Sequence, residues 1–76
     1  MYYVYVLKNR QKEITYIGYT NNLERRLREH REKEPELIYY EAYKSEGDAR
    51  NRELKLKQRG QSIRHLKNRI KISLEE

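Results

Sequence analysis

The sequence has no cysteine, phenylalanine or tryptophan, and its 76 residues include one proline and three glycines. Without cysteine there is no disulfide, and with His30 and His65 as the two histidines we expect no closed structural zinc site. The longest apolar run, residues 1–7, is far shorter than the roughly 20 residues of a membrane span, so we expect a cytoplasmic protein that does not enter a membrane. Glycine and proline are too scattered to mark a linker, which predicts a single domain over residues 1–76.

Positive charge and tyrosine are what the chain has in quantity. It carries 18 Lys and Arg against 12 Asp and Glu, a net charge of +6, and all eight tyrosines lie at or before Tyr43. Residues 1–43 hold eight basic and seven acidic residues, whereas residues 44–76 hold ten and five. A basic chain favours an acidic partner, with nucleic acid first (DNA ahead of RNA) and an anionic membrane surface second.

The pattern of apolar residues predicts a small α+β fold: a three-stranded antiparallel sheet packed by helices, in the order β-β-α-β-α-α. Segments rich in β-branched and aromatic residues predict three strands, over residues 2–7, 14–17 and 37–43. The short polar connection between the first two favours an antiparallel hairpin, and we expect Gly18 to end the second strand.

Polar residues that can cap helices precede three further segments. These predict helices over residues 21–32, 46–58 and 62–74. Asn21 with Glu24, and Ser45 with Asp48, are spaced as capping pairs for the first two helices. Ser62 is the expected cap of the third helix, whose apolar face consists of Ile63, Leu66, Ile70 and Leu74, and Gly60 is expected to end the second.

One acidic residue, Glu53, stands among nine Lys and Arg between residues 49 and 74. On a solvated helix it would pair with Lys57 four residues later, a contact worth about 0.2–0.5 kcal/mol. However, Glu53 shares a helical face with Ala49 and Leu56, which turns it toward the protein, where a carboxylate needs a compensating cation. That cation is either an arginine or a divalent metal, since Mg²⁺ is commonly held by one or two carboxylates together with substrate phosphates.

Other residues have the chemistry that phosphodiester hydrolysis needs: a positioned water, neutralised phosphoryl charge and help for the leaving oxygen. Arg26 offers a bidentate fork for phosphate, and His30, one turn later, can donate to phosphate or shuttle a proton. Tyr5 and Tyr16 lie in the first two predicted strands and can face one another. A free tyrosine, with a pKa of about 10, is a poor base at neutral pH, but a nearby arginine or metal would make its phenolate more accessible.

Taken in order, these residues resemble the GIY-YIG nuclease superfamily, in particular its small single-domain bacterial members. The two name-giving motifs are Tyr3-Val4-Tyr5 and Tyr16-Ile17-Gly18, with 11 residues from Tyr5 to Tyr16. Residues 19–26 resemble the segment that carries the family's catalytic arginine, and residues 49–57 resemble the helix that carries its metal-binding glutamate. Residues 66–69 are similar to a late helix whose asparagine supports the site.

The resemblance implies an endonuclease that uses one Mg²⁺ or Mn²⁺ ion. It assigns Tyr5 as general base or water-orienting group, Tyr16 as a group that positions water or phosphate, and Arg26 as the phosphate stabiliser. His30 falls at a frequent active-site histidine, and Glu53 at the metal ligand. In supporting roles, Gly18 allows a close approach of the backbone and Asn68 holds the site. The residues by themselves do not decide which tyrosine is the base.

The chain departs from the family pattern in two places. Tyr3 stands where the first motif has glycine, and residues 31–36 form a short segment with three acids where related proteins carry a longer, basic loop. The basic residues predicted to bind nucleic acid are Arg50, Lys57, Arg59, Arg64 and Lys67. Two other functions remain open: a nucleic-acid-binding module of the same fold with weak or no cleavage, because phosphate contacts give affinity without chemistry, and a protein-interaction domain.

Overall fold

The computed structural model describes residues 1–29, 36–58 and 60–76. Its elements, in chain order, are β1 (Tyr2–Lys8), β2 (Ile14–Thr20), α1 (Leu23–Glu29), β3 (Glu36–Tyr43), α2 (Glu46–Lys57), α3 (Gln61–Arg69) and α4 (Lys71–Glu75). The predicted α+β fold and its order of elements are confirmed, with α4 as an additional short helix. None of the helices in these described ranges is long and apolar enough to cross a membrane.

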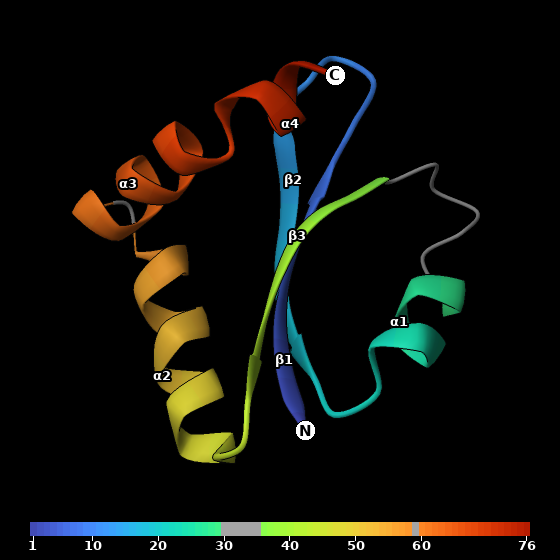
Figure 1. Cartoon of the computed structure of the whole chain (residues 1–76), viewed down its shortest axis with the longest axis vertical. Helices are drawn as coiled ribbons and strands as arrows, with labels where there is room; N and C mark the ends of the chain where they lie inside the picture. The colour runs from blue at the N-terminus through green and yellow to red at the C-terminus, as the bar shows by residue number, and fades with distance from the viewer. Residues whose placement is uncertain (30–35, 59) are drawn as a thin grey trace.

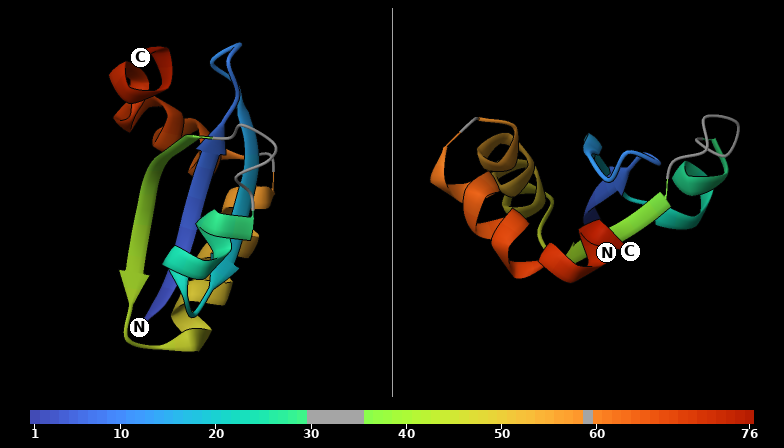
Figure 2. Two further views of the ribbon diagram at one scale, coloured as in Figure 1. Left: turned by 90° about the vertical axis from the view of Figure 1, so that its right-hand side faces the viewer. Right: turned by 90° about the horizontal axis from the view of Figure 1, so that it is seen from above.

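The sheet has the strand order β2-β1-β3, so β1 is central and the other two strands are edges. Both neighbours run antiparallel to β1, and Tyr5 in β1 lies between Gly18 of β2 and Tyr40 of β3. Figures 1 and 2 show α2 and α3 on one side of the sheet and α1 on the other. Side chains that alternate along β1 therefore face two different sets of helices.

The main core lies between the sheet and the pair α2 and α3. It is built from six buried residues: Val4, Val6, Ala49, Leu56, Leu66 and Ile70. Tyr5 and Leu7, which alternate with the valines of β1, are equally buried on the other side of the sheet. Because the chain has no phenylalanine or tryptophan, half-buried tyrosines complete the margin of this small core.

The second strand is longer than predicted, and Gly18 does not end it. Gly18 is paired with Tyr5 inside the ladder, and β2 continues to Thr20. At the other end of β2 the register shifts, because Leu7 pairs with Tyr16 and Lys8 pairs with Ile14. The extra residue between them makes a β-bulge, which re-aims the side chains that follow it.

Two of the three predicted helix caps are wrong. Asn22, not Asn21, caps α1, since its Oδ1 accepts a hydrogen bond of 3.0 Å from the backbone N–H of Arg25. Ser62 lies inside α3, which begins after Gly60 with no side-chain cap. The third prediction is confirmed: Ser45 Oγ accepts from the backbone N–H of Asp48 at 3.4 Å.

The helix predicted over residues 62–74 is interrupted at Ile70, which separates α3 from α4. The side chain of Lys8, 3 % exposed, holds the second piece. Its ammonium donates to the carbonyl oxygens of Ser73 (3.0 Å) and Leu74 (3.3 Å) near the end of α4. Free carbonyls at a helix C-terminus favour such a cation, so Lys8 ties the last helix to β1.

Glu41 joins β3 to α2. Its carboxylate accepts hydrogen bonds from the hydroxyls of Tyr39 (2.6 Å) and Tyr43, and from Nε (2.9 Å) and Nη2 (3.0 Å) of Arg52. Burial alone would raise the pKa of Glu41, but the hydrogen bonds from Arg52 and the two tyrosines outweigh burial and lower it. Burial and the hydrogen bond to Glu41 raise the pKa of Tyr43 to about 12.

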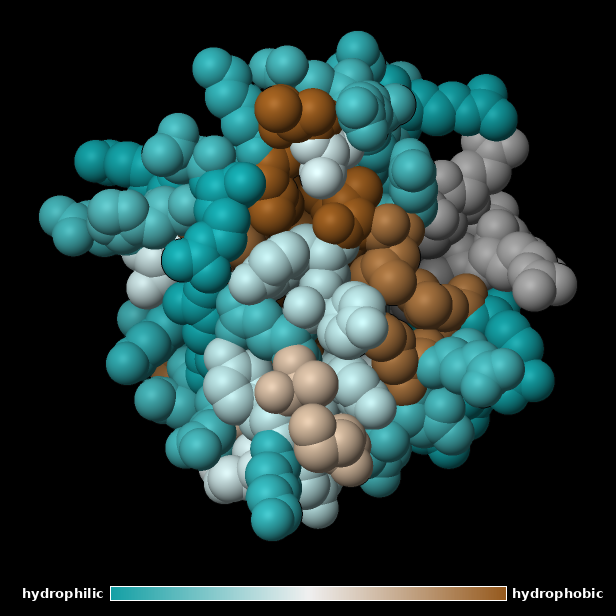
Figure 3. Space-filling view, viewed as in Figure 1, coloured by the Kyte–Doolittle hydropathy of each residue, from teal (hydrophilic) through white to brown (hydrophobic). Residues whose placement is uncertain are grey.

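Figure 3 shows the face over β3, with pale side chains at its centre, apolar ones near α4 and beside α1, and hydrophilic ones around them.

Candidate functional site

The candidate site is centred on two tyrosines from neighbouring strands. Tyr5 is 0 % exposed on β1, whereas Tyr16 is 42 % exposed on the edge strand β2. Their ring centroids lie 5.7 Å apart, with the planes tilted by 31°. A Cβ on Gly18 would lie 2.5 Å from Cε1 of Tyr16 and 2.6 Å from the hydroxyl oxygen of Tyr5. Gly18 therefore leaves the space in which the two rings meet.

Electrostatics around Tyr5 bring in two further predicted site residues. Burial raises the pKa of Tyr5, and the charge of Tyr16 and a hydrogen bond with Tyr16 raise it further, while Arg26 lowers it and Glu53 raises it. On balance the pKa of Tyr5 is raised, whereas Arg26 alone was expected to lower it. Burial and the hydrogen bond with Tyr16 therefore favour the protonated form of Tyr5.

Arg26 reaches this group from α1. Its Nη1 donates to Glu29 Oε2 at 3.2 Å, which holds one end of the guanidinium. Its Nε is buried and has no hydrogen-bond partner within the part of the chain that the structure describes. A buried donor without an acceptor costs about 1–3 kcal/mol, so this N–H is suited to an oxygen of an incoming ligand.

Glu53 reaches the group from α2, where it is both paired with a lysine and turned partly toward the protein, while its role as a metal ligand stays a prediction. It forms the helix-surface ion pair, with Lys57 Nζ 3.2 Å from its Oε2. Its side chain is also 23 % exposed and close enough to Tyr5 to raise that residue's pKa. Burial and the position near a phenol distinguish Glu53 from the exposed acids of the chain.

A metal would have few ligands here. Among the described residues, no three His, Cys, Asp or Glu side chains lie close enough to hold an ion. The Glu53 carboxylate nevertheless supplies hard oxygen ligands, which suit Mg²⁺ when substrate phosphate and water provide the rest. The site therefore fits a divalent ion that binds together with the substrate, and does not fit a preformed metal cage.

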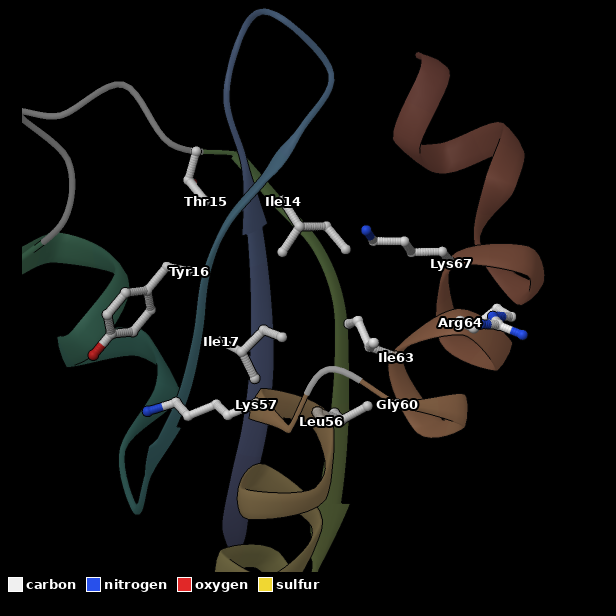
Figure 4. Close-up of a pocket in the computed structure, with 10 residues that line it drawn as sticks. All are labelled: Ile14, Thr15, Tyr16, Ile17, Leu56, Lys57, Gly60, Ile63, Arg64 and Lys67. Carbon is white, nitrogen blue, oxygen red and sulfur yellow. The ribbon is translucent and has the colours of Figure 1, made fainter.

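The residues predicted to bind nucleic acid divide into two groups. Arg50 is engaged on the surface, with its Cζ 4.7 Å from the centre of the Tyr19 ring and its Nη2 3.7 Å from Glu46. Lys57, Arg64 and Lys67 instead line one cavity of about 660 Å³ between β2, the end of α2 and α3 (Figure 4). Arg59 lies outside the described residues.

Two of the predicted site residues are not joined to this group. His30 lies outside the described residues, as do residues 31–35 of the short acidic segment. Asn68 is exposed on α3 and does not line the cavity, so its supporting role stays a prediction.

The sequence analysis missed Glu29, although its spacing of three from Arg26 on a predicted helix was a visible signal. The cavity had no sequence signal, because three separate segments of the chain form it.

One of three comparisons with known proteins identifies the family of the chain. The family model of the GIY-YIG catalytic domain matches residues 1–71, which include all four residues of the site and both motifs. No curated protein and no solved structure matches the chain. Because the family match covers nearly the whole length, the chain belongs to the GIY-YIG nuclease superfamily, whose substrates are nucleic acids.

Proposed function

We propose that the protein is a Mg²⁺-dependent endonuclease that hydrolyses phosphodiester bonds in DNA, one strand at a time. The observation that carries the proposal is the convergence of Tyr5, Tyr16, Arg26 and Glu53, from four different elements, around one buried phenol. A module that only binds nucleic acid needs exposed cations. It does not need an arginine and a carboxylate from two different helices beside the same tyrosine.

Tyr16 is the group that takes the proton of the attacking water. It is the exposed member of the pair, so a water beside the substrate can reach its oxygen. Tyr5 is fully buried and its raised pKa keeps it protonated at neutral pH. In this assignment Tyr5 acts as a positioning residue, through the hydrogen bond that it shares with Tyr16. This assignment reverses the order that the family resemblance implies for the two tyrosines.

Arg26 neutralises the phosphoryl group. Glu29 accepts from Nη1 at 3.2 Å. The other edge of the guanidinium, made of Nε and Nη2, is left to bind two phosphate oxygens. Because Glu29 holds one end of the guanidinium before the substrate arrives, less reorganisation is needed as charge develops in the transition state.

Glu53 is the residue that would hold a divalent ion, Mg²⁺ or Mn²⁺. When bound, that ion supplies positive charge to the phosphoryl and leaving oxygens. Lys57 competes for the same carboxylate through its 3.2 Å ion pair. We therefore expect weak metal binding without substrate, and stronger binding once phosphate oxygens share the ion.

Supercoiled plasmid incubated with the protein in Mg²⁺ or in EDTA tests the proposal. We expect open-circular DNA to accumulate in Mg²⁺ before linear DNA, because one active site cuts one strand, and no conversion in EDTA. Intact plasmid under both conditions, together with a salt-sensitive mobility shift, would favour the binding module instead.

A further inference from the structure

The cavity that contains Lys57 and Lys67 begins at the active site. Its lining includes Tyr16, the exposed tyrosine of the site, and Lys57, the ion-pair partner of Glu53. Figure 4 shows Lys57 extending to the side where the Tyr16 hydroxyl lies. From there the cavity follows β2 toward the β1–β2 connection, with α3 as its opposite wall. Because Tyr16 and Ile17 are neighbours in β2 and point to opposite faces of the strand, a nucleic-acid strand bound at the site reaches the cavity around the edge of β2.

The floor of the cavity is aliphatic. The bulge in β2 gives Ile14 and Ile17 the same direction, and Figure 4 shows both pointing toward α3, where Ile63 faces them. Leu56 completes the floor from below. The three isoleucines are only partly buried, so this apolar surface stays accessible beside the core. Its volume of about 660 Å³ is within the range of roughly 300–1,000 Å³ that small-ligand sites have.

One cation reaches over this floor, and two others lie at its margin. Figure 4 shows Lys67 reaching across from α3 toward Ile14, and Arg64 on the outer side of the same helix. None of the ten described residues that line the cavity is acidic. The combination selects a ligand that has both an apolar face and negative charge.

We propose that this cavity holds the base of an unpaired nucleotide next to the scissile phosphate, with the flanking phosphate on Lys67. A nucleobase has a planar apolar face, and every nucleotide carries one phosphate charge. In a continuous duplex the faces are stacked against each other, so the aliphatic floor contributes only when a base leaves the stack. This inference rests on the proposed function, because the base is placed next to the phosphate that the active site would cleave. It narrows the substrate to single-stranded, flapped or bulged DNA.

Equilibrium binding in EDTA tests the inference without requiring cleavage. A labelled single-stranded oligonucleotide should bind about fivefold to tenfold tighter than both a duplex of the same sequence and a strand of the same length made of abasic sites. The abasic strand keeps the phosphates and lacks the bases, so it isolates the aliphatic floor in the wild-type protein. Equal affinity for the three probes would overturn the inference.

Matched pairs of variants test whether the preference for single strands comes from the cavity. Ile63→Ala should weaken single-strand binding about fivefold and leave duplex binding within twofold, whereas Ile72→Ala, 71 % exposed on α4, should change neither. Lys67→Ala should weaken binding of all three probes, and Lys55→Ala, exposed on α2 and outside the cavity, should not. If polyglutamate displaced the oligonucleotide as effectively as unlabelled single strand does, the occupant would be an acidic protein segment and the inference would be wrong.

The plasmid assay separates this inference from the proposed function. Metal-dependent nicking with no preference for unpaired bases would contradict the inference alone. A preference for unpaired bases without nicking would contradict the proposed function, while the cavity would stand as a nucleic-acid site.

Discussion

The hydroxyl oxygen of Tyr5 lies 2.6 Å from the point where a Cβ on Gly18 would be, because the two residues are direct partners across β1 and β2. The absence of a side chain on the edge strand is thus what lets a buried phenol from the central strand meet Tyr16. The glycine of the second motif therefore provides the space that the tyrosine of the first motif occupies.

Gly18→Ala should therefore damage the site more than the fold. The new methyl group displaces the Tyr5 and Tyr16 rings, and a shift of about 1 Å in catalytic groups can cost roughly 100-fold in rate. We expect a loss of nicking rate of that order, with about 1–3 kcal/mol lost from the free energy of unfolding in urea. Gly47→Ala is the matched control, since its added Cβ meets nothing closer than 3.6 Å and nicking should be unchanged. Equal nicking rates for the two variants would contradict the packing account.

The two tyrosines should differ when each loses its hydroxyl. Tyr16→Phe removes the proposed base and should lower the nicking rate about 100-fold or more. Tyr5→Phe keeps the buried ring and removes one hydrogen bond to Tyr16, which should cost about tenfold. Single-turnover nicking of each variant measures both effects.

The pH profile distinguishes the roles of the tyrosines. A base acts when deprotonated, so the rate should rise with pH. Because the pKa of Tyr5 is raised above its ordinary value of 10.0, Tyr5 remains protonated across the neutral range. Tyr5→Phe should keep the rising limb at a lower overall rate, because the proposed base is still present, whereas Tyr16→Phe should lose it. If Tyr5→Phe abolished the pH dependence and Tyr16→Phe kept it, the assignment would be reversed.

Arg26→Lys should show that geometry matters beyond charge. Lysine keeps the positive charge but cannot present two parallel N–H donors, so we expect a loss of about 100-fold in nicking rate. Arg25→Lys on the same helix is the control, because Arg25 is 54 % exposed and its ion pair with Glu29 is long, at 3.8 Å. That variant should cleave within twofold of wild type. A similar loss in both variants would point to an effect on α1 as a whole.

The Glu41 network should make the fold sensitive to acid. The pKa of Glu41 is lowered in the folded protein, so its contribution is present above the ordinary value of 4.5 and is lost as pH falls below it. Glu41→Gln should destabilise the protein by about 2 kcal/mol at neutral pH, because charged hydrogen bonds to Arg52 are lost. The difference from wild type should shrink at acidic pH. Urea unfolding across this range measures it, with the exposed Glu75→Gln as control; a difference independent of pH would contradict the network.

The sequence predicted the arrangement better than it predicted the ends of elements. Segments rich in β-branched and aromatic residues defined three strands, and the spacing of Ala49, Glu53 and Leu56 predicted that Glu53 turns inward, which its 23 % exposure agrees with. The prediction failed at Gly18, because a glycine in a strand reads as a break unless the ring that fills its space is known. It failed at Asn21 because two adjacent asparagines are equally good caps in sequence, and only the backbone decides between them.

Two features of the site depend on long-range packing. The pKa of Tyr5 is raised because burial outweighs the effect of the Arg26 charge. That burial is set by strands and helices that are distant in the chain. The aliphatic cavity depends on a register shift in β2 and on the position of α3, neither of which leaves a local pattern.

Glu53→Gln gives the most direct test of the account, because it removes one charge from the proposed metal ligand and keeps the shape of the side chain. Nicking of supercoiled plasmid in Mg²⁺ and oligonucleotide binding in EDTA should be measured in parallel, with Asp48→Asn, exposed on the same helix, as control. We predict that Glu53→Gln nicks at least about 100-fold more slowly while its oligonucleotide affinity stays within threefold, and that the control cleaves as wild type. Wild-type nicking by Glu53→Gln would contradict the claim that this carboxylate holds the metal of the active site.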